Sequence, residues 1–246
     1  MVETSAILVV DANDGQTAPP RCWYNHRALR RPSAVLLFAV TALLLGAVPT
    51  RAQDEVPPPI GRFVLDLHGT FPKFTDNGEL AASRGLAQNE LPGIGLGIYA
   101  GAHVYIFRWK AMTVGLGGDV TLARAHSSAV ELNGAEVARA VTERFVHASP
   151  QLSLNFGDRD GWSYLSAGVG PARWSVVPDN GVATPADEER LQTISYGGGA
   201  RWFVKRHLGF SVDVRFYAIN PGTPQGDRPG SPRTTLFVAG AGISVK

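Results

Sequence analysis

The chain has 246 residues, of which 18% are charged, and it contains 28 glycines and 17 prolines. Both residue types weaken helix interiors, so the composition favours strands and turns over long helices. From Gln53 onward the chain carries 18 basic and 18 acidic residues. This neutral balance argues against nucleic-acid binding, which depends on a basic surface.

The first 52 residues have the order of an N-terminal extension followed by a secretory signal peptide. A basic segment, 27–31, precedes the apolar run 34–48, and small residues follow at 50–52. We expect cleavage after Ala52, because the run is short for a membrane-spanning helix; an uncleaved anchor is the alternative. Residues 1–26 are explained either by a long leader or by an over-extended gene start. The only cysteine, Cys22, lies in this leader, so the mature chain has no thiol to mispair in an oxidising compartment.

A proline-rich linker, 53–60, precedes a region of regular alternation between apolar and polar residues. In the clearest segment, 91–106, Ile98 and its even-numbered neighbours are apolar, whereas Tyr99 and His103 share a face with glycines. Successive side chains of a strand point to opposite faces, so each such segment predicts a strand with one apolar face. The predicted strands cover 61–71, 91–106, 111–124, 143–156, 162–174, 191–204, 208–219 and 234–246.

Two positions leave local alternatives open. Pro150 lies within the fourth predicted strand and has no backbone N–H, so we expect either a bulge or a lost hydrogen bond there. The segment 130–137, which lies in a long connection, fits a helical turn or a strand extension equally well.

The connections between the eight strands alternate in length, beginning and ending with a long one. Bacterial outer-membrane barrels have an even strand number, short periplasmic turns and longer extracellular loops. Mid-strand charges fit the lumen of such a barrel and also the exterior of a soluble, lipocalin-like barrel. Aromatic residues beside every short turn favour the membrane barrel, whose interfaces carry an aromatic girdle. The expected girdle consists of Phe107, Trp109, Phe156, Trp162, Trp202 and Phe203.

On these features the chain resembles the small eight-stranded outer-membrane β-barrels of the OmpA-type and opacity-type group over residues 61–246. The final strand is similar to the assembly signal of that group, although Ile243 and Val245 are not aromatic and Lys246 follows them. The resemblance implies an all-β, antiparallel, up-and-down transmembrane barrel in the outer membrane after signal-peptide-dependent export. It also implies outer-membrane lipid and the barrel assembly machinery as partners.

The orientation that follows places Ile98 against lipid and Gly97 in the lumen, so Ile98→Arg is predicted to impair insertion far more than Gly97→Ser. An eight-stranded barrel is just wide enough for side chains to fill its interior. We therefore expect a polar lumen network in which Arg201 and Asp213 pair across a hairpin. The expected network contains Asp66, His68, His103, Asp119, Arg201, Asp213 and Arg215.

The leading functional hypothesis is a non-enzymatic barrel, without cofactor or metal, that acts in envelope structure or surface interaction. A narrow pore and a small-ligand barrel are alternatives. A further alternative is an outer-membrane lipid A deacylase, in which Ser128 would be the nucleophile, His126 the base and Glu143 the orienting acid.

Overall fold

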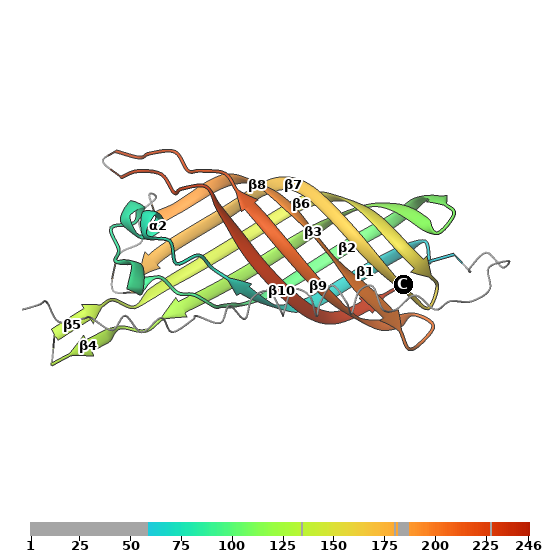
Figure 1. Cartoon of the computed structure of the whole chain (residues 1–246), viewed down its shortest axis with the longest axis horizontal. Helices are drawn as coiled ribbons and strands as arrows, with labels where there is room; N and C mark the ends of the chain where they lie inside the picture. The colour runs from blue at the N-terminus through green and yellow to red at the C-terminus, as the bar shows by residue number, and fades with distance from the viewer. Residues whose placement is uncertain (1–58, 134, 180, 182–186, 227) are drawn as a thin grey trace, which may run out of the picture. The chain divides into compact units, whose positions relative to one another are not determined.

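The chain forms a closed antiparallel barrel of eight strands, which confirms the predicted fold class. The computed structural model describes residues 59–246 except 134, 180, 182–186 and 227. The predicted signal peptide and nearly all of the 53–60 linker lie outside the described residues. Each strand pairs with its neighbours along the chain, and the last strand closes the barrel against the first (Figure 1). The strands are β1 (Phe63–Lys73), β2 (Leu96–Trp109), β3 (Met112–Ser127), β6 (Val141–Asp158), β7 (Gly161–Pro178), β8 (Glu188–Phe203), β9 (Leu208–Ile219) and β10 (Thr234–Val245).

The two ends of the barrel differ in their connections. The short turns after β2, β6 and β8 lie at one end, the short-turn end, together with the start of β1 and the end of β10. The four long connections lie at the other, the long-loop end. The first of them contains α2 (Gly78–Ser83) and the 3₁₀ helix η1 (Gln88–Glu90). Within the described residues, none of the helices could serve as a transmembrane helix.

The second long connection, between β3 and β6, forms a strand extension and not a helical turn, which decides between the two alternatives that the sequence had left open. β4 (Val130–Leu132) and β5 (Ala135–Ala138) pair as a two-stranded sheet outside the barrel sheet. Figure 1 shows this hairpin extending beyond the ends of β3 and β6. Several barrel strands are also longer than predicted at the long-loop end; β7 runs to Pro178 and β8 begins at Glu188.

Two irregularities shape the barrel wall. β2 and β3 change register between Tyr105 and Phe107, so beyond this bulge the odd-numbered Phe107 and Trp109 take the outward positions. β6 and β7 keep the same register before and after Ala148–Pro150, but these three residues of β6 do not pair with β7. Pro150 therefore interrupts the ladder by hydrogen-bond loss and not by a bulge, because it has no N–H to donate.

In the middle part of the barrel the outward face is apolar and the charged residues face in. Ile98 and Leu152 are 56% and 51% exposed, whereas Asp66 and Arg201 are 4% and 2% exposed. A soluble barrel would bury its apolar face, because exposure of a contiguous apolar band to water is unfavourable. The soluble lipocalin-like alternative is therefore wrong.

Candidate functional site

The candidate site is the charged interior of the barrel. Arg201 on β8 reaches across to Asp66 on β1 with two hydrogen bonds, Nε to Oδ1 at 2.9 Å and Nη2 to Oδ2 at 2.6 Å. Ser244 on β10 also donates to Asp66 at 2.6 Å, and the Arg201 guanidinium lies 3.7 Å from the centre of the Tyr164 ring. A bidentate, charge-assisted pair of this kind fixes both side chains in place.

A second cluster surrounds Arg215 on β9. Its Nε lies 3.0 Å from Oδ1 of Asp213, and its Nη1 lies 3.4 Å from Oδ2 of Asp119 on β3. Tyr164 donates its hydroxyl hydrogen to Asp213 at 2.5 Å, and Ser149 donates to Asp119 at 2.8 Å. Three carboxylates thus share two guanidinium groups in the middle of the lumen.

The expected Arg201–Asp213 pair is wrong. The β8–β9 register places Arg201 opposite Ser211 and Asp213 opposite Gly199, one pleat repeat away. Each residue finds a partner elsewhere: Arg201 binds Asp66 across the lumen, and Asp213 pairs with Arg215 on its own strand.

The lumen histidines are embedded in the same network. His68 lies 2.7 Å from the Ser211 hydroxyl and stacks on Tyr99, while His103 is 2% exposed. The described residues hold no group of three or more His, Cys, Asp or Glu side chains arranged to bind a metal ion. Three buried tyrosines also wall the network, Tyr99, Tyr164 and Tyr217. They were not part of the predicted network, although their position on the polar face of each strand was a usable signal.

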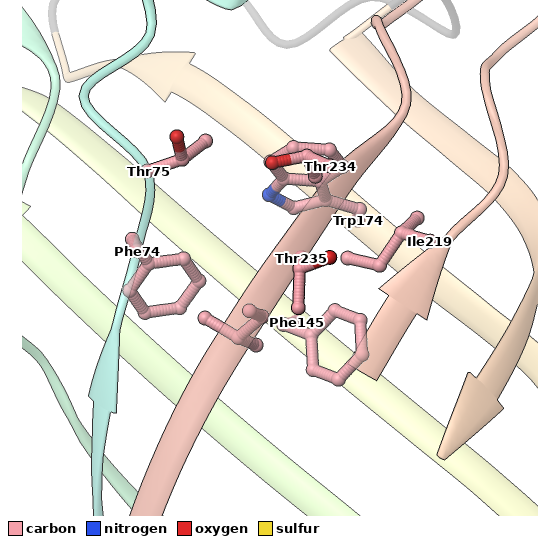
Figure 2. Close-up of a pocket in the computed structure, with 8 residues that line it drawn as sticks. Phe74, Thr75, Phe145, Trp174, Ile219, Thr234 and Thr235 are labelled. Carbon is pink, nitrogen blue, oxygen red and sulfur yellow. The ribbon is translucent and has the colours of Figure 1, made fainter. Parts of the chain in front are cut away.

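Apolar packing closes the lumen at the long-loop end. Trp174, Phe145 and Leu80 are at most 1% exposed, and the Trp174 indole N–H donates to Glu143 at 2.7 Å. Figure 2 shows the small cavity that remains beside them, lined by residues such as Phe74 and Ile219. Its volume is about 10 Å³, about the space that one water molecule needs.

The first long connection is held over this end by two ion pairs, one buried and one partly exposed. Arg84 lies directly after α2 and binds Glu189 of β8 at 2.6 Å and Ser231 at 2.8 Å. Glu90 of η1 accepts from the side chain and the backbone N–H of Arg139, both at 2.8 Å. These contacts fix the loop to two other long connections.

We expect the Glu90–Arg139 link to persist in acid. The hydrogen bonds from Arg139 lower the pKa of Glu90 from 4.5 to about 2, in spite of burial. A pKa depressed by folding adds stability that is complete above the unfolded value of 4.5 and is lost as the pH falls through about 2. The Arg139 amide resonance, followed by NMR, should therefore titrate near pH 2. This transition should vanish in Glu90→Gln, and a midpoint at an ordinary glutamate pKa in the native chain would contradict the link.

Aromatic packing closes the short-turn end, which corrects part of the expected girdle. Trp162 is 3% exposed, stacks on Phe203 at 4.8 Å and meets Tyr105 edge-on at 6.0 Å. Trp162 and Phe203 thus plug the lumen instead of facing out. The other four girdle residues are exposed on the exterior: Phe107, Trp109, Phe156 and Trp202.

The residues of the deacylase alternative are not brought together as a triad. His126 and Glu143 occupy neighbouring strands but opposite faces: His126 is exposed, and Glu143 is buried and bound to Trp174. His126 Nδ1 lies instead 3.4 Å from Asp179, and Ser128 is an exposed residue beyond the end of β3. The orienting role given to Glu143 is wrong, because strand parity points it into the barrel.

No family model matches the chain, and no curated protein matches it. Among solved structures, the neisserial surface protein A has a TM-score of 0.50 and 13% identity, over 76% of this chain and 97% of that chain. The attachment invasion locus protein Ail of Yersinia pestis, in complex with the heparin analogue sucrose octasulfate, has a TM-score of 0.41 and 12% identity over 74% and 97%. The outer membrane protein OprG from Pseudomonas aeruginosa has a TM-score of 0.41 and 11% identity over 78% and 98%. At this identity the likeness to the neisserial protein shows a common fold, that of the small eight-stranded outer-membrane barrels.

Proposed function

We propose that this chain, which has the fold of the small outer-membrane barrels, is a non-enzymatic outer-membrane protein that serves envelope structure or surface interaction. The observation that carries the proposal is the combination of an apolar exterior with a lumen filled by paired charges and closed at both ends. Lipid would surround the exterior, and the lumen network would stabilise the barrel rather than conduct ions. The pore alternative receives no support from a lumen plugged by Trp162 on one side and Trp174 on the other.

The proposed orientation places the short-turn end in the periplasm and the long loops outside the cell. This is the arrangement of bacterial barrels, whose extracellular loops are the longer ones. Signal-peptide-dependent export and recognition of β10 by the barrel assembly machinery would precede insertion. The closure of β10 against β1 is compatible with such a route, since the final strand completes the barrel.

A role in surface interaction is supported by the β4–β5 hairpin. Val130 and Leu132 are 53% and 62% exposed on this hairpin, beyond the barrel end. Exposed apolar residues on an extracellular loop are typical of a contact surface for another molecule.

Membrane fractionation and conductance test the proposal together. The mature protein should be recovered with outer membranes and should migrate faster on gels before heating than after, because a closed barrel resists detergent. Purified barrel should then give no unitary conductance steps in a planar bilayer. Recovery in the soluble fraction would overturn the membrane assignment, and regular single-channel steps would overturn the sealed lumen.

A further inference from the structure

Four arginines form a row on the outside of the barrel near the long-loop end. Arg124, Arg144, Arg173 and Arg190 lie on the adjacent strands β3, β6, β7 and β8, and all are exposed. Arg124 lies directly opposite Arg144 in the β3–β6 register, and Arg173 lies directly opposite Arg190 in the β7–β8 register. The row therefore consists of two opposed pairs of like charge.

The protein leaves most of this charge uncompensated. The Arg173–Glu188 contact of 3.9 Å, between half-exposed side chains, is the one ion pair that the row makes among the described residues. Like charges directly opposite each other in a sheet destabilise it, and a loose surface pair contributes little. An anion bound between the two arginines of an opposed pair would attract both of them and so offset their mutual repulsion.

The row lies at the height of a bilayer surface. Arg144 is separated by twelve residues from Phe156 on β6, and Arg190 by twelve residues from Trp202 on β8. Twelve residues at about 3.3 Å each cover about 40 Å, or about 28 Å along the axis of a barrel whose strands tilt by about 45°. This distance matches the hydrocarbon thickness of about 30 Å, so the arginines reach the headgroups when the aromatic residues lie at the opposite interface.

A groove runs across the outer wall beside the row. It is a shallow depression, wide open to the exterior, and outward-facing small residues such as Ala102, Gly118 and Ala148 line it. On β7 the groove residue Pro171 is one pleat repeat from Arg173, and on β6 Ala148 is two repeats from Arg144. The groove thus lies in the apolar band, on the membrane side of the arginine row and one or two pleat repeats from it.

We propose that the arginine row and the groove together bind a phosphorylated lipid of the outer leaflet. The lipid phosphates would lie between the opposed guanidinium groups, which suit bidentate binding of phosphate, and an acyl chain would occupy the groove. A headgroup with more than one phosphate fits the row best, because the two arginine pairs span four adjacent strands. This inference rests on the proposed outer-membrane function, since it requires an inserted barrel.

Full-length mature protein, folded into phosphatidylcholine vesicles with and without diphosphoryl lipid A, tests the arginine row. The Arg124→Gln/Arg144→Gln variant should unfold at a lower temperature than the native chain in the doped vesicles, and at a higher temperature in the undoped ones. Loss of a lipid contact explains the first shift, and loss of repulsion the second. Lys205→Gln/Arg206→Gln removes the same charge from the exposed short turn after β8 and should shift neither temperature.

Binding of diphosphoryl lipid A itself should fall at least tenfold in the Arg124→Gln/Arg144→Gln variant. Ala148→Leu, which fills the groove, should also weaken binding, whereas Ala167→Leu at an outward site beyond the groove should not. Equal binding by the native chain and the double variant would overturn the proposal, as would full competition by inorganic phosphate or equal binding of phosphatidylglycerol. Failure of the native chain to insert at all would instead overturn the proposed membrane function, so the two failures are distinguishable.

Discussion

The Leu152→Arg variant should fail to accumulate as a folded barrel in a bilayer. Leu152 is 51% exposed and lies near the centre of the outward apolar face, between Arg144 and Phe156 on β6. An arginine on the lipid face of a barrel costs about 2–4 kcal/mol at the bilayer midplane and less toward the interfaces. Ile98 is a milder site, because it lies one pleat repeat from Leu96, which pairs with Arg124 of the arginine row.

Folding into lipid vesicles, followed by the heat-modifiable gel shift, measures this effect. The matched control is Leu132→Arg, which adds the same side chain at a 62% exposed position on β4, outside the barrel sheet. The control should fold as efficiently as the native chain. Equal folding of both variants would show that the outward face does not meet lipid.

Arg201→Met should give the largest loss of stability among substitutions inside the lumen. It leaves Asp66 buried without its bidentate partner, since the two side chains are 2% exposed or less. Breaking a buried ion pair by removal of one partner typically costs about 3–5 kcal/mol, because the remaining charge is uncompensated. The free energy of unfolding in urea, measured in vesicles or detergent, reports this loss.

The Arg201→Met/Asp66→Leu double variant separates charge from packing. Replacement of both partners by apolar residues removes the uncompensated charge, so the double variant should recover much of the stability lost in Arg201→Met. Arg206→Met, in the exposed turn after β8, serves as the surface control and should leave the free energy of unfolding nearly unchanged. A double variant no more stable than Arg201→Met would show that the loss does not come from the uncompensated charge of Asp66, and would assign it to other contacts of Arg201, such as that with the Tyr164 ring.

Long-range partners in the lumen lie beyond the reach of sequence reasoning. Parity alone identified Asp66, Asp119, Arg201 and Arg215 as inward residues, because strand alternation is local. Parity does not identify which inward side chains contact each other. Arg201 and Asp66 are 135 positions apart and form a contact only because the barrel closes. The hairpin rule favoured Asp213 because it lies on the next strand across a short turn, whereas the register offset and the narrow lumen favoured Asp66.

The sequence also does not show how much room a residue in the barrel wall has for a larger side chain. The sequence predicts that Gly97→Ser is far milder than Ile98→Arg, because Gly97 faces the lumen. A Cβ at Gly97 would lie 2.5 Å from the Leu122 carbonyl oxygen and 2.6 Å from Thr70 Oγ1. Those atoms belong to the neighbouring strands β3 and β1, so Gly97 allows a close approach that its own strand does not reveal. We therefore expect Gly97→Ser to destabilise the barrel as well, although by a local clash and not by a charge in lipid.

The number of barrel strands, their inward and outward faces and the alternation of short and long connections could all be predicted from the sequence. These properties follow from the two-residue period of a strand and from local turn composition, which need no knowledge of distant residues. The tertiary structure alone decided that Trp162 plugs the lumen, that Arg201 binds Asp66 and that four arginines align on the exterior. Each of these depends on register between strands and on closure of the sheet, which the whole barrel fixes at once.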